Sequence, residues 1–122
     1  MKDGKSVYLL LTLTVRSCSA KEVEQTKALL NSGLREMVQI ESIRCSLFFR
    51  YCFLETVYHP SVPLDVQYHP HLHCIVELRG KRPSCKVIQE CWRQACGLDY
   101  DPILDVRKLP DFDILHSYPP AG

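Results

Sequence analysis

Three of the five histidines in this chain occupy alternate positions of one apolar segment. The segment YHPHLHCIVEL spans residues 68–78 and contains His69, His71 and His73. It reads as a β-strand, in which residues i, i+2 and i+4 share one face. Neighbours on that face lie about 6.5 Å apart, so two imidazoles can converge on one cation. The opposite face then carries Leu72, Cys74 and Val76.

A carboxylate is expected to join these histidines from the preceding strand. Glu55 lies in the aromatic, β-rich segment CSLFFRYCFLETVY, residues 45–58. An antiparallel pairing of that segment with residues 68–78 would bring Glu55 alongside the imidazoles. Two imidazoles and a carboxylate, with coordination positions left open, suit a divalent ion that acts as a Lewis acid.

Two other interpretations of the histidines stay open. They could be polar residues of a solvated strand face, one of them a hydrogen-bonded core histidine. They could also belong to a structural zinc site, although the cysteines of the chain do not have zinc-ligand spacing.

Composition predicts one cytoplasmic domain. A length of 122 residues, 46% hydrophobic and 24% charged, suits a single core. The net charge of +1 counts against a large duplex-DNA binder, and the basic clusters RGKRP (79–83) and Arg107-Lys108 are short. The seven cysteines contain no CxxC, no secretory signal opens the chain, and the apolar run 7–15 is too short to span a bilayer. We therefore expect reduced thiols and no membrane partner.

The segments around the histidines alternate between strand and helix patterns. Residues 6–16, SVYLLLTLTVR, read as a central strand that is apolar on both faces. Ser19 and Glu22 have the spacing of a capping box, which predicts a helix starting there. Gly33 weakens the middle of that helix by about 1 kcal/mol relative to alanine. Its apolar positions are Val23, Leu30, Leu34 and Met37.

A second helix and a last strand follow the histidine segment. Ser84 is the expected N-cap, and Gly97 is well placed to end the helix. Residues 100–109, YDPILDVRKL, read as an edge strand. The order strand, helix, strand, strand, helix, strand predicts an α+β fold, a ferredoxin-like antiparallel sheet with helices packed on one face. The second helix has an apolar stripe of Val87, Ile88, Cys91, Trp92 and Ala95.

The histidine segment resembles a motif of a known enzyme superfamily. HLH (71–73), followed by apolar residues, is similar to the His-hydrophobic-His motif of the HUH endonucleases. The longer YHPHLHCIVEL resembles the second motif of replication initiators from rolling-circle plasmids. The resemblance covers about residues 8–109. It is supported by LLTLTVR (10–16), FRYCFLETVYHP (49–60) and the segment from Trp92 to Arg107.

The resemblance implies a DNA-nicking activity at a plasmid origin. His71 and His73 would be metal ligands, with Glu55 or His69 as the third. The ion would be Mn²⁺ or Mg²⁺, which polarises the scissile phosphate of single-stranded origin DNA. A tyrosine would attack that phosphate and become joined to the 5′ end. The oligomeric state is not indicated.

The tyrosine motif of the family has no match here. The family places its tyrosine on a helix behind the histidines, in a context like KY-x-x-K. Tyr100, in LDYDPILDV, and Tyr118, in HSYPPAG, are the remaining candidates, and prolines follow both. The resemblance ends near Leu109, so we expect a partial initiator domain over 1–109 and an irregular, proline-rich tail over 110–122. Such a truncated initiator would bind DNA without nicking it.

Three alternatives to that hypothesis remain. The chain could be an active nuclease that uses Tyr100, Tyr118 or a metal-activated water. It could be a fragment of a related HUH transposase or relaxase. It could also be a non-enzymatic ferredoxin-like binding module whose histidines are incidental. Metal affinity separates the last from the others, and a covalent protein–DNA adduct separates an active nickase from an inactive one.

Overall fold

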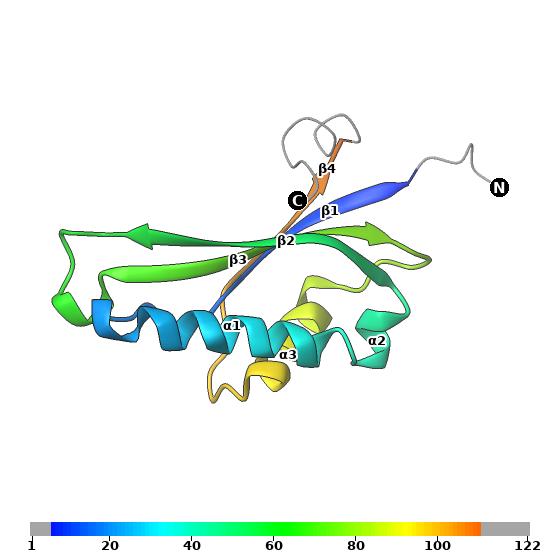
Figure 1. Cartoon of the computed structure of the whole chain (residues 1–122). Coiled ribbons are helices and arrows are strands. Elements are labelled where there is room, and N and C mark those ends of the chain that lie inside the picture. The colour runs from blue at the N-terminus through cyan, green and yellow to red at the C-terminus, as the bar shows by residue number, and fades with distance from the viewer. Residues whose placement is uncertain (1–5, 111–122) are drawn as a thin grey trace.

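The computed structural model describes residues 6–110 as one four-stranded sheet with a layer of helices (Figure 1). Two short 3-10 turns, Ala20–Glu22 and Leu64–Val66, precede α1 and β3. No helix within the described residues has both the length and the apolar character needed to cross a membrane. The strands and helices are β1 (Val7–Thr14), α1 (Val23–Met37), α2 (Glu41–Arg44), β2 (Leu47–Tyr58), β3 (Tyr68–Leu78), α3 (Cys85–Cys96) and β4 (Leu104–Leu109).

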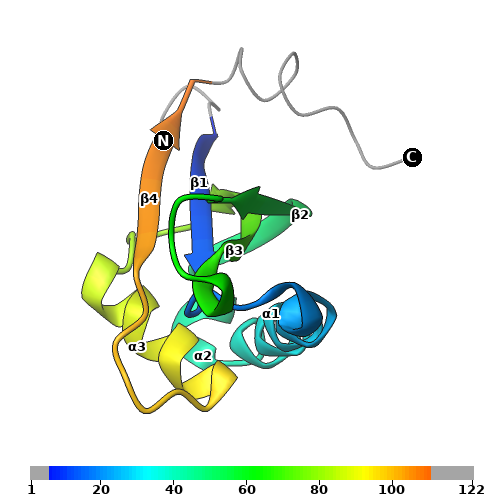
Figure 2. The same ribbon diagram turned by 90° about the vertical axis from the view of Figure 1, so that its left-hand side faces the viewer.

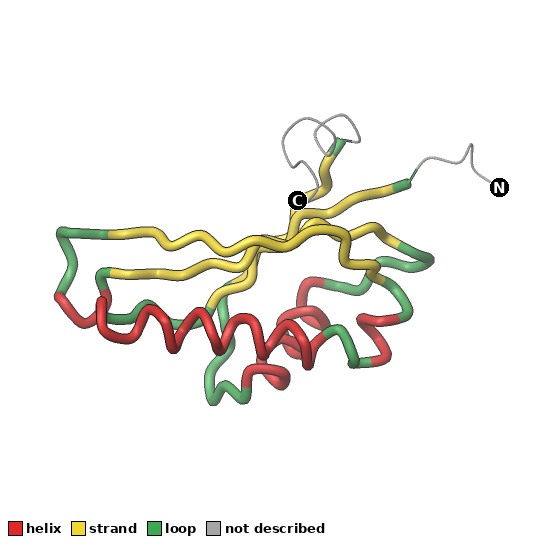
Figure 3. The backbone as a smooth tube through the Cα atoms, in the orientation of Figure 1, coloured by secondary structure: helices red, strands yellow, loops and turns green. Residues whose placement is uncertain are grey.

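The sheet has the strand order β2-β3-β1-β4, and each neighbouring pair is antiparallel. All three helices lie on the same side of it, as Figure 3 shows. This arrangement confirms the α+β, ferredoxin-like prediction. Within the described part of the chain, the other face of the sheet carries no helix. That open face is where β3 presents its odd-numbered residues.

The core lies between the sheet and the helices. Alternate residues of β1 and β3 point into it, because side chains of a strand alternate between its faces. Leu9, Leu11 and Leu13 are fully buried, and so is Cys74 of β3. The predicted central position of the first strand is confirmed, since β1 lies between β3 and β4. On the open face, Tyr8, Leu10 and Thr12 are half-buried.

The two long helices pack closely against each other, side by side beneath the sheet (Figure 2). A Cβ atom added to Gly33 of α1 would collide with Cys96 Sγ and would lie 3.1 Å from the Trp92 ring. Trp92 is fully buried, and its indole N–H donates to the Thr14 carbonyl at 2.9 Å. The absence of a side chain at Gly33 therefore lets α1 approach the tryptophan that ties α3 to β1.

The predicted helix boundaries are largely confirmed. The backbone N–H of Ser19 donates to Glu22 Oε1 at 3.1 Å, which is the expected capping box. Ser84 Oγ accepts from the Val87 N–H at 3.1 Å, and Gly97 ends α3 with a φ of 68°. Val87 itself is 39% exposed, so it does not belong to the buried stripe of α3. All seven cysteines are free, as expected.

The last strand is shorter than predicted, because residues 100–103 form a loop in front of β4. Side chains bind two carbonyls of this loop: Gln89 donates to Pro102 O at 2.8 Å and Thr14 donates to Ile103 O at 2.6 Å. The short helix α2 was not predicted. The expected tail over 110–122 lies, from residue 111 onward, outside the described residues.

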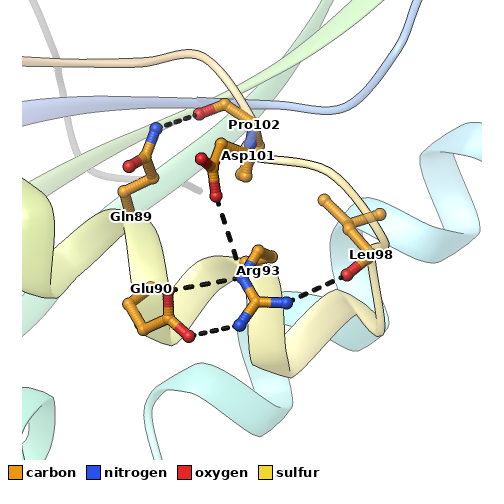
Figure 4. A network of polar contacts seen from close by, with 6 residues as sticks. All are labelled: Gln89, Glu90, Arg93, Leu98, Asp101 and Pro102. Atoms are coloured by element: carbon orange, nitrogen blue, oxygen red, sulfur yellow. Dashed lines mark hydrogen bonds and ion pairs between the residues drawn. The ribbon is translucent and has the colours of Figure 1, made fainter.

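Arg93 of α3 holds the start of the same loop (Figure 4). Its guanidinium pairs with Glu90 one turn earlier and donates to the Leu98 carbonyl at 3.3 Å. Asp101 lies 3.9 Å from Arg93 Nε. These contacts hold the α3–β4 loop on the helix end, which sets where Tyr100 lies.

Candidate metal centre

The antiparallel pairing of β2 with β3 brings Glu55 to the histidines. Glu55 lies directly opposite His71, and Phe53 lies opposite His73. One ligand atom each from Glu55, His71 and His73 lies within 4.8 Å of the other two. Three ligand atoms in adjacent octahedral positions, each about 2.1 Å from one ion, lie about 3 Å from one another. The side chains would therefore have to close by up to about 1.8 Å for all three to bind one ion, and two imidazoles with a carboxylate suit a divalent cation.

His73 is hydrogen-bonded on both of its ring nitrogens. Nε2 lies 2.8 Å from Glu55 Oε1, and Nδ1 lies 3.1 Å from the Thr12 hydroxyl of β1. Its ring also stacks on Phe53, with centroids 4.9 Å apart. The side chain of His73 is 14% exposed and that of Glu55 is 58% exposed. The centre is thus supported on its β1 side and open to solvent on its β2 side.

Thr12 is a residue of this centre that the sequence analysis missed. It lies directly opposite His73 in the pairing of β1 with β3. When Nε2 binds a cation, Nδ1 keeps its proton and donates to Thr12 Oγ1. In the structure itself Nε2 donates to the Glu55 carboxylate and Nδ1 accepts from Thr12. Because a hydroxyl can donate or accept, Thr12 can hold the His73 ring in the same orientation in both tautomers, a role that ligand-supporting residues commonly have. The segment LLTLTVR indicated a strand, but only the strand register places this threonine beside His73.

His69 is engaged by the backbone and by its neighbour. Its Nε2 lies 2.9 Å from the Val15 carbonyl, and since a carbonyl only accepts, Nε2 is the protonated nitrogen. In the neutral ring, Nδ1 then accepts from His71 Nε2 at 3.3 Å. His69 is not part of the group whose ligand atoms gather. Of the two predicted third ligands, Glu55 is the one that the geometry places beside both His71 and His73.

The local environment keeps His71 neutral. Burial lowers its pKa below the usual range, the neighbouring His69 and His73 lower it further, and Glu55 acts in the opposite direction. A depressed imidazole pKa leaves the ring uncharged at neutral pH, with one nitrogen protonated and the other free to bind. That is the form in which histidine binds a metal ion.

Tyr100, the weak nucleophile candidate, lies in the α3–β4 loop. Its hydroxyl accepts from the Arg16 backbone N–H at 2.9 Å, and the Arg16 guanidinium lies 4.0 Å above its ring. Tyr100 and His69 line the same cavity, which has a volume of about 230 Å³. The phenol is therefore on the side of the histidine row where His69 lies, and its oxygen is hydrogen-bonded to a backbone N–H. Tyr118, the other candidate, lies outside the described residues.

Comparisons with known proteins match this chain to replication proteins. A family model described as "Replication protein" matches residues 1–114. A protein named "Protein rep" from Bacillus sp is 26% identical over 107 residues, which cover 84% of this chain and 34% of that protein. A "Protein rep" from Streptococcus pneumoniae serotype 2 is 27% identical over 118 residues, or 90% of this chain and 36% of that protein.

The chain thus spans about a third of the length of these curated relatives. A third, "Protein rep" from Bacillus amyloliquefaciens, is 25% identical over 107 residues, covering 84% of this chain and 31% of the relative. No solved structure matches the chain.

Proposed function

The chain belongs to the Rep replication protein family, and on that premise we propose that it carries the metal-dependent DNA-nicking centre of a rolling-circle plasmid replication initiator. The observation that supports the proposal most is the cluster of Glu55, His71 and His73 on the open face of the sheet. Single-stranded origin DNA is the proposed substrate. The same face, which no helix covers within the described residues, would receive it.

His71, His73 and Glu55 would hold Mn²⁺ or Mg²⁺, and the ion would supply Lewis-acid polarisation of the scissile phosphate. The chain's own part is to keep these ligands neutral or anionic and correctly oriented. The depressed pKa of His71 keeps its imidazole uncharged. The Thr12 hydroxyl supports the orientation of the His73 ring.

Within residues 6–110, Tyr100 is the candidate nucleophile, and its contacts do not favour attack. An attacking oxygen must lie in line with phosphorus at about 3–3.5 Å. The Tyr100 hydroxyl is bound to the Arg16 backbone, so it would have to leave that contact first. We therefore propose that the chain binds single-stranded DNA and metal but forms no covalent adduct.

Calorimetric titration with manganese tests the metal site. The wild-type chain should bind about one ion, and the double variant His71→Ala, His73→Ala should bind none. His59→Ala is the matched control, because His59 is an exposed histidine of the β2–β3 connection whose side chain makes no hydrogen bond within residues 6–110. Its effect on the pKa of His71 is the smallest of those acting on that ring. Equal binding by the double variant and the control would eliminate this centre and favour the non-enzymatic module.

A denaturing gel tests the missing nucleophile. The protein is incubated with manganese and a labelled single-stranded origin library, and no shifted protein–DNA band is expected. A band that disappears in Tyr100→Phe or Tyr118→Phe would show instead that the chain is a working nickase. Cleavage without a shifted band would indicate attack by water.

A further inference from the structure

An exposed aromatic ring lies close to two guanidinium groups at the open end of the β2–β3 hairpin, away from the 59–67 connection. Phe48 is 42% exposed. The Arg79 guanidinium lies 4.3 Å from the centre of its ring, and that of Arg50 lies 5.2 Å away. Phe48 is paired with Glu77. Glu77 has the same strand parity as His71 and His73, so the ring is on the open face that carries the metal centre.

The charge of this end of the hairpin is strongly positive. Glu77 is its acidic residue, and it is already bound: Arg50 Nη1 lies 3.3 Å and Ser6 Oγ 2.8 Å from its carboxylate oxygens. Within residues 6–110 no carboxylate pairs with Arg79. Lys81 and Arg82, which follow it, are also exposed and have no acidic partner in the same described range.

The turn that carries these cations is fixed to the sheet. The backbone N–H of Arg79 donates to the Ser46 carbonyl at 2.7 Å, which ties the end of β3 to the start of β2. Gly80 then has a φ of 70°, a left-handed conformation that glycine adopts without strain. The position of Arg79 over Phe48 is therefore set by backbone contacts.

We propose that Phe48, Arg50, Arg79, Lys81 and Arg82 form a second contact for single-stranded DNA, distinct from the metal centre. Every base has a π face, so an exposed ring can stack on it regardless of sequence. Guanidinium groups beside the ring neutralise the adjoining phosphates. The proposal shares its substrate class with the proposed nicking function and extends the binding surface of that substrate.

The strand geometry connects this contact with the metal centre. Glu77 lies four residues along β3 from His73, which corresponds to about 13 Å. Between the two sites, the open face carries Tyr51, whose ring centroid is 5.7 Å from that of Phe53, the ring that stacks on His73. A single strand can follow these rings from Phe48 to the histidines. A negatively charged protein partner would use the cations but would have no need of the aromatic ring.

Fluorescence anisotropy with a labelled oligothymidylate, in EDTA, tests the contact without the metal centre. Arg79→Glu should weaken binding, and the slope of log K against log salt should fall by about 0.7 for each phosphate that the variant no longer neutralises. Phe48→Ala should weaken binding about tenfold, while Phe48→Tyr should bind like wild type. Arg35→Glu is the matched control, because Arg35 is an exposed arginine of α1, in the helix layer.

The outcomes separate this proposal from the nicking proposal. If Arg79→Glu and Phe48→Ala bind the oligonucleotide as Arg35→Glu does, the second contact is refuted. That conclusion holds whether or not the chain binds manganese. If only the charge change matters and Phe48→Ala has no effect, the surface is an electrostatic docking site and the stacking proposal is wrong. If both weaken DNA binding while wild type fails to bind manganese, the contact stands and the nicking proposal falls. Thermal melts check that each variant is folded.

Discussion

The Thr12 hydroxyl is one of the contacts that orient the His73 ring. It lies 3.1 Å from Nδ1, on the ring edge opposite Glu55. Removal of a group that supports a metal ligand in this way typically costs about 10- to 100-fold in metal affinity, so a decrease of that size is expected for Thr12→Val. Calorimetry with manganese measures it.

Thr12→Ser is the control for that prediction. Serine keeps the hydroxyl and removes one methyl group, so its manganese affinity should stay close to that of wild type. Valine matches threonine in shape and removes only the hydrogen bond. Equal affinities for the valine and serine variants would show that Thr12 merely fills space beside His73.

At the scale of elements, the fold depends on how closely α1 approaches α3. Gly33→Ala should raise the helix propensity of α1 by about 1 kcal/mol. The added methyl group would nevertheless collide with Cys96 Sγ and approach the rigid Trp92 ring. Overpacking of this kind typically costs about 1–3 kcal/mol, so a net decrease in stability is expected. Urea denaturation measures the change in the free energy of unfolding.

A double-mutant cycle identifies the cause of that decrease. Cys96→Ala removes the nearest atom, so Gly33→Ala should cost less in the Cys96→Ala background than in wild type. The contact with Trp92 would remain, which leaves part of the cost. A Gly33→Ala variant more stable than wild type would mean that helix propensity outweighs the packing of the two helices.

At the scale of the whole molecule, the metal centre should stabilise the fold. Glu55, His71 and His73 come from two strands that are adjacent in the sheet only when the chain is folded. An ion that binds only the folded chain adds about 2.7 kcal/mol at a concentration of about 100 times its Kd. Manganese should therefore raise the melting temperature by several degrees, as differential scanning calorimetry would show.

The same measurement on two histidine variants gives the control. Manganese should leave the melting temperature of the variant His71→Ala, His73→Ala unchanged, and it should stabilise His59→Ala as it stabilises wild type. A similar rise in all three proteins would mean that manganese binds elsewhere on the chain.

The sequence by itself determined the long helices and the strands in outline, the face of β3 that carries the histidines and the identity of their carboxylate neighbour. These follow from local rules, because strand periodicity places His69, His71 and His73 together and capping residues such as Ser84 mark helix ends. A short connection between β2 and β3 makes their antiparallel pairing the simplest solution, which brings Glu55 to the cluster.

Only the tertiary structure decided the contacts between elements that are distant in the chain. Thr12 meets His73 because β1 lies between β3 and β4, and the register of that pairing cannot be read from either strand alone. Residues 100–103 form a loop and not the predicted strand, because the side chains of Gln89 and Thr14 bind carbonyls of this segment. Such contacts join residues far apart in sequence, and their formation depends on how all the layers pack together.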